Sequence, residues 1–375
     1  QQLPLANDTV VEPQEGTGVR LTIDEDLQFL AQHRLAKAVR QAGGISGTAI
    51  VTDVESGQIL ALADYPSFDP NHYQDYRENN YGSRALLDVY EPGSVQKILT
   101  FASLIDAGYV TPRTQLKVPH ELPRDGTIIH DVEDHGLWPL TAAGVIAKSS
   151  NIGAVLASTD FPTQTWYDYL RSFGLGSPTG VGIGGESHGL LPTPNQWLPV
   201  THDTIAFGQG LSVNAVQMAA AVSTIANGGV YVHPSLIESY VDSAGNVTPA
   251  APPATHRVVS EHAARDVARM MELVVGPQGT APDVAIPGYD VAGKTGTAQR
   301  PGKNGGYNGT TVSFAGFAPA EAPRFMVYVV IQKPNAGETG SHAAGPVFKD
   351  LMSAALKKYG VPPSTSHQPA FKVFW

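Results

Sequence analysis

Hydrophobic and polar positions follow two different periods along the chain, and each period predicts its own kind of element. Near the N-terminus, Asp24 is placed to cap a helix whose apolar residues recur at helical spacing and which ends before Gly43-Gly44. Two runs of β-forming residues follow, at 46–54 and 58–63, and the turn residues between them predict a hairpin. A sheet is therefore expected to begin near residue 46.

The strand pattern returns late in the chain, and helical spacing fills the region between. It predicts strands at 289–299, 310–319 and 324–332, a glycine-rich loop at 300–309 and a terminal helix at 343–359. Helices are predicted at 93–106, 140–157, 165–173, 215–226 and 260–275, with a surface excursion at 241–257. This order predicts an α/β protein of the α+β type: an antiparallel sheet of about five strands, N- and C-terminal helices, and an all-helical subdomain packed against the sheet.

Composition narrows the functions that the chain can have. Of its 375 residues, 42% are hydrophobic, which is enough for a sizeable core. Lysine and arginine number 24 against 34 aspartates and glutamates, and the resulting net charge of -10 argues against nucleic acid as a partner. The absence of cysteine excludes a disulfide framework, a thiolate zinc site, an iron-sulfur cluster and a cysteine nucleophile. The histidines form no H-x-x-x-H pair beside a glutamate, so neither a metal nor a cofactor is predicted.

The longest stretch without a charged residue runs from 204 to 237, which is long enough to span a bilayer. It contains glutamine, asparagine and glycine residues, and we therefore interpret it as buried soluble structure. The chain begins at Gln1 without a signal-like segment, so its start is interpreted as processed or trimmed, with any membrane anchor upstream.

Two general motifs fail on their context. Residues 288–295 match the phosphate loop G-x-x-x-x-G-K-T, but a proline-bounded segment precedes them and Gly296 follows, where a helix would have to begin. Residues 185–189 match the nucleophile elbow G-x-S-x-G around Ser187, but neither a core strand nor a helix flanks them. Both are interpreted as incidental.

A third set of motifs agrees with its context. Ser94 lies in the first turn of a predicted helix, and Lys97 follows one turn later on the same face, where a lysine of lowered pKa can remove the proton of the serine hydroxyl. Ser149 and Asn151 form an S-x-N motif, which requires a loop between two helices, and Gly153 is compatible with such a break.

The third motif is residues 294–297 (KTGT), placed in a predicted strand. Gly296 allows close approach of a ligand backbone, the hydroxyls of Thr295 and Thr297 can bind a carboxylate, and Lys294 supplies positive charge. Each motif alone is weak, but their occurrence in this order on helix, loop and strand is not readily attributed to chance.

In that order, S-x-x-K, S-x-N and K-T-G resemble the signature of penicillin-binding proteins and class A β-lactamases. The stretches 19–24, 48–53, 207–211, 225–229 and 313–317 resemble class B penicillin-binding proteins, the monofunctional transpeptidases. Three others, 130–136, 148–153 and 180–189, are most similar to the division-specific septal type of actinobacteria.

The resemblance implies a penicillin-binding, serine β-lactamase-like fold, a peptidoglycan D,D-transpeptidase activity and a role for each matched residue. Ser94 would attack the D-Ala-D-Ala end of a stem peptide, with Lys97 as the base for acylation. Ser149 and Asn151 would relay protons and hold the donor peptide. Lys294, Thr295, Gly296 and Thr297 would bind the terminal carboxylate, and the amides of Ser94 and Thr297 would form the oxyanion hole.

The resemblance also implies a domain plan and partners. We expect a linker at 1–17, a transpeptidase domain at 18–360 and a tail at 361–375, with a sheet subdomain at about 18–65 and 285–360 and a helical one at about 85–280. Expected partners are stem peptides as donor and amine acceptor, β-lactams, and divisome proteins that include a glycosyltransferase. The expected location is the extracytoplasmic face of the bacterial membrane, with the family's anchor and pedestal missing from this chain.

Three alternatives remain open at this point. A D,D-carboxypeptidase would use water as the acceptor, and a β-lactamase of the same fold would hydrolyse its acyl-enzyme rapidly. A catalytically idle β-lactam sensor or divisome scaffold would need neither reaction, although the intact Ser94, Lys97 and Lys294 argue against idleness.

Overall fold

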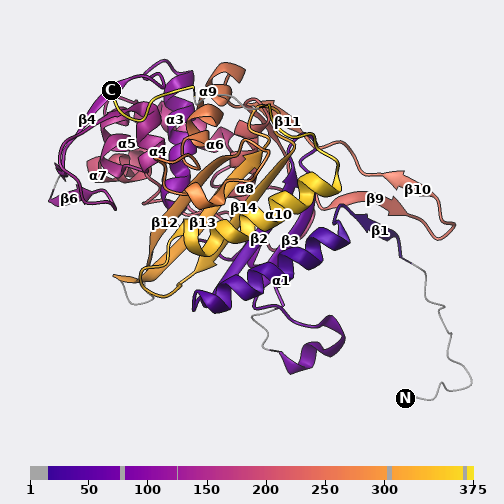
Figure 1. Ribbon diagram of the computed structural model, residues 1–375. Helices are drawn as coiled ribbons and strands as arrows, with labels where there is room; N and C mark the ends of the chain where they lie inside the picture. The colour runs from indigo at the N-terminus through magenta and orange to yellow at the C-terminus, as the bar shows by residue number, and fades with distance from the viewer. Residues whose placement is uncertain (1–15, 77–80, 125, 302–305, 366–369) are drawn as a thin grey trace, which may run out of the picture.

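The sheet at the centre of the molecule is built from both ends of the chain. The computed structural model describes residues 16–76, 81–124, 126–301, 306–365 and 370–375. The five antiparallel strands of the central sheet lie in the order β12-β13-β14-β2-β3 (Figure 1). They are β2 (Ser46–Asp53), β3 (Ile59–Tyr65), β12 (Ala292–Pro301), β13 (Tyr307–Ala318) and β14 (Phe325–Gln332). The N- and C-terminal parts meet where β2 pairs with β14, which confirms the predicted antiparallel sheet of about five strands.

Helices cover both faces of this sheet, and all residues of β2 and β14 are therefore buried. On one face lie α1 (Glu25–Gln41) and α10 (Gly345–Lys358), which contact each other and the sheet (Figure 1). Asp24 caps α1 by accepting hydrogen bonds from the amides of Asp26 and Leu27, as predicted. The other face packs against α8 (Ala215–Ala226), with all of its residues buried.

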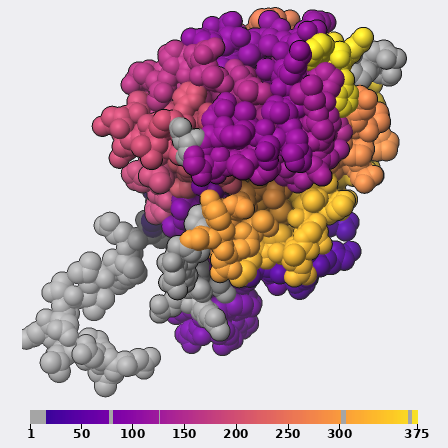
Figure 2. Space-filling model, turned by 90° about the vertical axis from the view of Figure 1, so that its left-hand side faces the viewer, coloured from indigo at the N-terminus to yellow at the C-terminus, as the bar shows by residue number. Residues whose placement is uncertain are grey.

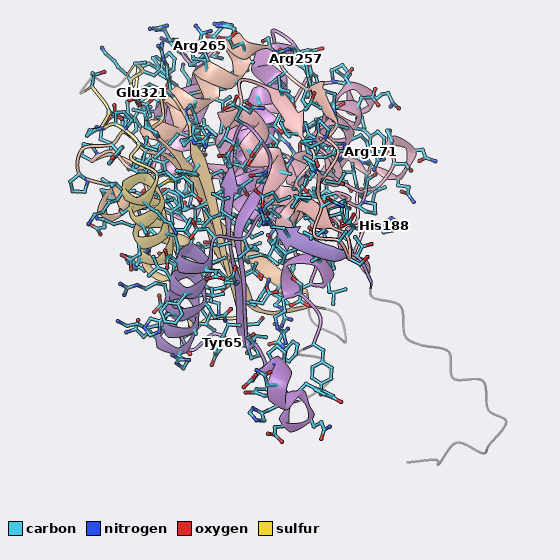
Figure 3. All side chains as sticks on the ribbon, turned by 90° about the vertical axis from the view of Figure 1, so that its right-hand side faces the viewer. Tyr65, Arg171, His188, Arg257, Arg265 and Glu321 are labelled. Atoms are coloured by element: carbon cyan, nitrogen blue, oxygen red, sulfur yellow. The ribbon has the colours of Figure 1, made fainter. Side chains whose placement is uncertain are left out.

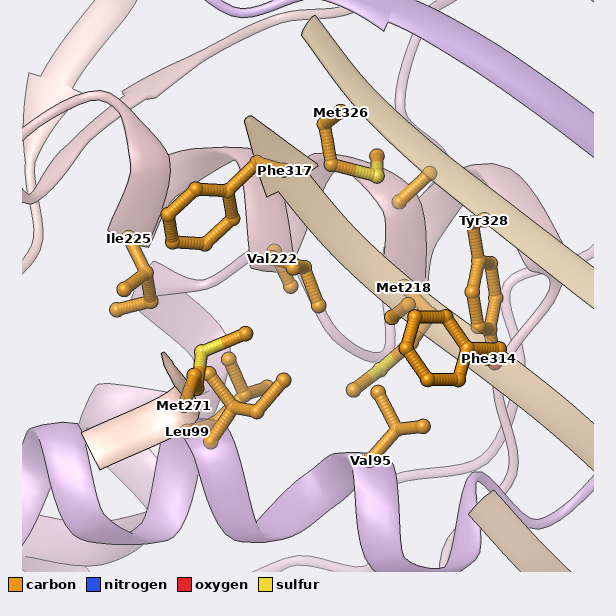
Figure 4. Packing of buried hydrophobic residues seen from close by; sticks show 14 of the residues in the cluster. Val95, Leu99, Met218, Val222, Ile225, Met271, Phe314, Phe317, Met326 and Tyr328 are labelled. Atoms are coloured by element: carbon orange, nitrogen blue, oxygen red, sulfur yellow. The ribbon is translucent and has the colours of Figure 1, made fainter. Parts of the chain in front are cut away.

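The helix that carries the first motif is anchored in the core. It is α3 (Gln96–Asp106), preceded by the single turn η3 (Gly93–Val95). Figure 4 shows Val95 and Leu99 packed among side chains of α8, of β13 and of α9 (Glu261–Glu272). Burying each such side chain stabilises the fold by roughly 1.5–3 kcal/mol. The start of α3 is therefore held rigidly against the sheet.

The predicted all-helical insertion is wrong in one respect, because it also contains short strands. The further helical segments are η1 (Pro70–Asp75), α2 (Arg84–Leu87), α4 (Ala142–Lys148), α5 (Asn151–Ser158), α6 (Thr163–Ser172), η4 (Pro194–Gln196), α7 (Pro199–Ile205), η5 (Pro282–Val284) and η6 (Gly340–Ala344). The strands are β4 (Gln115–Val118) with β7 (Trp138–Thr141), β5 (Glu121–Arg124) with β6 (Thr127–His130), and β8 (Val230–Val232) with β11 (Thr255–Arg257). Strands of three or four residues are too short to show a period.

A small separate sheet takes up part of the predicted surface excursion. It has the order β1-β9-β10, with β1 (Gly18–Leu21), β9 (Ile237–Val241) and β10 (Val247–Pro249). The excursion at 241–257 lies at the surface but contains β10 and β11 rather than irregular chain alone. Figure 3, viewed from the right-hand side of Figure 1, shows Arg257 and Arg265 along the top of the molecule and Arg171 at its right-hand side.

The predicted helix at 140–157 is two helices, and their break lies earlier than Gly153. α4 ends where Ser149 takes the left-handed conformation with φ of 58°, and Ser150 then caps α5 by accepting a hydrogen bond from the amide of Gly153. Gly153 itself lies inside α5, where a Cβ would come within 2.6 Å of the side chain of Val145. The glycine therefore serves close packing of the two helices, and the serine pair makes the turn.

The last residues of the chain dock on the helical part. The amide of Thr141 donates to the carbonyl of Val373 over 3.0 Å, the amide of Trp375 donates to the carbonyl of Pro139 over 3.1 Å, and Phe371 and Val373 are buried. Gly144 of α4 is required here, because a Cβ would lie 2.0 Å from the Val373 carbonyl oxygen. The tail thus extends the β4–β7 pair just before α4 begins.

Some predicted segments fall partly outside the described residues. The predicted linker at 1–17 does so except for its last two residues. The predicted loop at 300–309 is largely taken up by the strands β12 and β13, whose residues Pro301 and Tyr307 pair, and 302–305 lie outside the description. Within the described ranges, no helix combines the length and apolar character needed to cross a membrane.

Candidate active site

The three motifs meet where the helical part lies against strand β12. Figure 2 shows this side of the molecule, with the purple helical part above the orange β12–β13 hairpin. Gly93 makes the close approach possible, because a Cβ on it would lie 2.6 Å from the Thr297 carbonyl oxygen. Gly296 does the same from the strand, where a Cβ would lie 2.9 Å from the side chain of Val95. The contact brings the backbones of residues 93–94 and 296–297 together.

Lys97 lies at the centre of the site. Its Nζ is 2.9 Å from Ser94 Oγ, 2.7 Å from Asn151 Oδ1 and 2.6 Å from the carbonyl oxygen of Ser149. Two of these neighbours, the Ser149 carbonyl and Asn151 Oδ1, are acceptors only. A neutral amine therefore gives its two hydrogens to them and turns its lone pair toward the hydroxyl of Ser94.

The electrostatics of the site favour that neutral form. Burial lowers the pKa of Lys97 from its usual value to about 7, while the nearby charge of Asp131 opposes the change. The pKa of Lys294 is also lowered, by burial and then by the charge of Lys97. Both side chains are 0% exposed, so the two amines do not both carry a full charge near neutral pH.

Ser149 links the two lysines. Lys294 Nζ donates to Ser149 Oγ over 2.7 Å, and the same Oγ is 3.5 Å from Lys97 Nζ. The left-handed conformation of Ser149 makes this possible, since its hydroxyl faces β12 while its carbonyl faces Lys97. Ser149 Oγ therefore lies between the two amines, bonded to Lys294 and at the outer limit of hydrogen-bond distance from Lys97.

The threonines of the strand motif differ in their surroundings. The hydroxyl of Thr295 is hydrogen-bonded to that of Thr280 over 3.0 Å, whereas the side chain of Thr297 is exposed. Thr297 thus offers the more accessible hydroxyl, while that of half-buried Thr295 is already paired with Thr280. All predicted site residues are brought together here: Ser94, Lys97, Ser149, Asn151, Lys294, Thr295, Gly296 and Thr297.

The sequence motifs did not indicate Asp131, which lies directly behind Asn151. Its Oδ1 accepts hydrogen bonds from the amides of Asn151 and Ile152 at the start of α5. The signal that was available is its position in the stretch 130–136, which carried the resemblance but no assigned role.

The two dismissed motifs are confirmed as incidental. Residues 293–295 lie within strand β12 and no helix follows them, so the phosphate-loop context is absent. Residues 185–189 form a loop without a flanking strand or helix. Among the described residues, no group of three or more histidines or carboxylates is placed to hold a metal ion.

Comparison with known proteins agrees with this geometry. A family model described as the penicillin binding protein transpeptidase domain matches residues 47–353. The chain is 37% identical over 369 residues to penicillin-binding protein PbpB of Mycolicibacterium smegmatis, covering 95% of this chain and 57% of that protein. It is 35% identical to the peptidoglycan D,D-transpeptidase FtsI of Escherichia coli K12, covering 94% of this chain and 58% of that protein.

A solved structure gives the same picture. Penicillin-binding protein 3 of Mycobacterium tuberculosis, complexed with aztreonam, superimposes with a TM-score of 0.88 at 37% identity, covering 93% of this chain and 81% of that one. The fold predicted from the sequence is therefore confirmed. The chain spans less than two thirds of the length of the two full-length relatives named above.

Proposed function

The chain belongs to the penicillin-binding protein transpeptidase family, and from this membership and the geometry of its site we propose that it is a class B peptidoglycan D,D-transpeptidase. The observation that carries the proposal is the position of Lys97 Nζ, which lies 2.9 Å from Ser94 Oγ and is also bound by two acceptors, the Ser149 carbonyl and Asn151 Oδ1. A serine with a positioned neutral base is an activated nucleophile.

In the first half-reaction, Ser94 Oγ attacks the carbonyl carbon of the penultimate D-Ala, and Lys97 takes the hydroxyl proton. The amides of Ser94 and Thr297 stabilise the oxyanion of the tetrahedral intermediate. The C–N bond then breaks, and a proton passes through Ser149 to the leaving amine of the terminal D-Ala. Lys294 and Thr297 hold the carboxylate of that D-Ala throughout.

In the second half-reaction, an amine of a neighbouring stem peptide attacks the Ser94 ester. The amine loses a proton to Lys97, the ester C–O bond breaks, and Ser94 Oγ recovers its hydrogen. The product is a cross-linked peptide. A β-lactam carries a carboxylate and a strained amide in corresponding places, so it acylates Ser94 and leaves a stable ester. A relative named as a penicillin-binding protein and a solved relative bound to aztreonam support this.

We also infer the setting in which the enzyme works. Resemblance to the septal type, together with relatives named PbpB and FtsI, supports a role in cell division at the extracytoplasmic face of the membrane. Divisome proteins that include a glycosyltransferase are the proposed partners, because cross-linking requires freshly polymerised glycan strands. The assignments of domains to 1–17, 18–360 and 361–375 stay predictions.

The proposal is tested by offering the purified protein a stem pentapeptide ending in D-Ala-D-Ala together with a D-amino acid, and separating the products by mass. The expected result is release of D-Ala with incorporation of the added amino acid. Release of D-Ala with hydrolysis alone would identify a D,D-carboxypeptidase. Rapid turnover of a labelled penicillin would identify a β-lactamase, and neither release nor a penicillin adduct would identify an idle scaffold.

A further inference from the structure

Asp131, between β6 and β7, is a buried carboxylate, and three of its four hydrogen-bond partners lie at the start of α5. Oδ1 accepts from the amides of Asn151 and Ile152, and Oδ2 accepts from Ser150 Oγ over 2.6 Å and faces His135 Nε2 at 3.0 Å. The side chain is 3% exposed. A carboxylate held in this way by four neighbours has a single position.

Three of these bonds fix the start of α5, where the amides of the first turn have no partner within the helix. Ser150 covers the amide of Gly153 over 2.8 Å, while Asp131 covers those of Asn151 and Ile152. The negative charge also lies at the positive end of the helix dipole. Asp131 therefore acts as a second cap, supplied from 20 residues away.

The backbone of the neighbouring His130 fixes the side-chain amide of Asn151. The Nδ2 of Asn151 donates to the His130 carbonyl over 3.0 Å, which leaves Oδ1 turned toward Lys97 Nζ at 2.7 Å. With the backbone of Asn151 held by Asp131, both the position and the orientation of its amide group are set from residues 130 and 131.

We propose that Asp131 is a positioning residue for acylation: it holds the start of α5 so that Ser149 and Asn151 direct the lone pair of Lys97 at Ser94. The inference rests on the proposed function and adds a residue outside the three motifs. The hydrogen bonds of Asp131 go to the start of α5 and to His135 rather than to Ser94, so it acts through Asn151 and through the charge that it places near Lys97.

A layer of side chains holds Asp131 from behind. The ring of His135 stacks on Trp138 with centroids 3.7 Å apart and an angle of 7°, and its side chain is 3% exposed. Lys148 Nζ lies 5.5 Å from the centroid of the Trp138 ring and 3.6 Å from a carboxylate oxygen of Glu133. Lys148, which precedes Ser149, therefore contacts Trp138 and Glu133, and these contacts indicate a structural role.

The charge of Asp131 affects the pH dependence of acylation, which a purely structural role would leave unchanged. Lys97 is faced by Lys294 from β12 and by Asp131 from the β6–β7 segment, with His135, Lys148 and Glu133 around that carboxylate. Asp131 raises the pKa of Lys97 against the effect of burial. Replacing it with a neutral residue therefore lowers that pKa further and moves the rise of the acylation rate to lower pH.

The test compares Asp131→Asn with Asp134→Asn, whose side chain is 89% exposed on the same segment. The second-order rate constant for acylation by a labelled penicillin is measured from pH 5 to 9. For Asp131→Asn we expect a decrease of about 10- to 100-fold, as for a displaced catalytic group, with the midpoint of the pH profile at lower pH than in the wild type. Asp134→Asn should match the wild type.

Wild-type rate and midpoint in Asp131→Asn would overturn the inference, as would a lower rate with an unmoved midpoint. Absence of acylation in the wild type would instead overturn the proposed function. If Asp131→Asn fails to fold, His135→Phe takes its place, since it removes one hydrogen bond to Asp131 and keeps the stack on Trp138. A several-fold decrease in rate is expected for it, and an unchanged rate overturns the inference.

Discussion

The two sides of the active site are held in different ways. Ser94 and Lys97 lie one turn apart on a single continuous segment, and the same core side chains support both. Ser149 and Asn151 lie on either side of a helix break. Lys294 and Asp131 hold them there, and the tail docks at the start of α4, the helix that ends at Ser149. The first side is set by local helix geometry, and the second by contacts between distant segments. Substitutions far from Ser94 should therefore disturb the positions of Ser149 and Asn151 more than those of Ser94 and Lys97.

The largest effect is expected on the local side, from removal of the base. Lys97→Ala should lower the rate constant for acylation by labelled penicillin by about 10³-fold, because a positioned general base contributes roughly 10²–10⁴. The exposed Lys37→Ala serves as the control. Near-UV circular dichroism should show that both variants are folded. Loss of folding in Lys97→Ala alone would mean that the lysine is structural.

The pH dependence tests whether the two sides together keep Lys97 neutral. Because the pKa of Lys97 is about 7, the amine is mostly protonated at pH 5.5 and mostly neutral at pH 8. Only the neutral form accepts the proton of Ser94, so the acylation rate should rise about 30-fold over this interval and then level off. Stopped-flow measurement with a chromogenic cephalosporin gives the profile. A rate that continues to rise to pH 10 would show an ordinary lysine.

Removal of the tail tests the distant supports. Truncation after Ala370 exposes the surfaces that Phe371 and Val373 cover, and should lower the free energy of unfolding by about 3 kcal/mol. Because the tail borders the start of α4, we also expect acylation to slow several-fold. Chemical denaturation and penicillin labelling measure the two effects, with Lys372→Ala as the control because its side chain is exposed. Full stability after truncation would contradict a docked tail.

The smallest effect is expected at the other lysine beside the site. Lys148 pairs with a largely exposed Glu133 at 3.6 Å, and such pairs contribute about 0–1 kcal/mol. Lys148→Gln should therefore change the free energy of unfolding by less than about 1 kcal/mol and the acylation rate by less than about twofold. A decrease near that of Lys97→Ala would place Lys148 in the chemistry.

The same contrast explains what the sequence could and could not predict. The spacing of Ser94 and Lys97, the strand that carries Lys294 and the five-stranded sheet follow from periods of 3.6 and 2 residues, which are visible in any window of the chain. The S-x-N motif requires a loop between Ser149 and Asn151, but its exact position cannot be read from the sequence, because a left-handed serine leaves no periodic signal. The contact of Asp131 with Asn151 joins residues 20 positions apart, and that of Thr141 with Lys372 joins residues 231 positions apart. Local sequence patterns cannot predict contacts between residues so far apart in the chain.

The central claim is that Ser94 is the acylated nucleophile. Its most direct test is to label the protein with penicillin, digest it and locate the adduct by mass, in the wild type, in Ser94→Ala and in Ser187→Ala. The last variant removes the serine of the incidental nucleophile-elbow motif. The account predicts a stable adduct on the peptide that contains Ser94, lost only in Ser94→Ala. An adduct on another serine, or one that persists in Ser94→Ala, would contradict it.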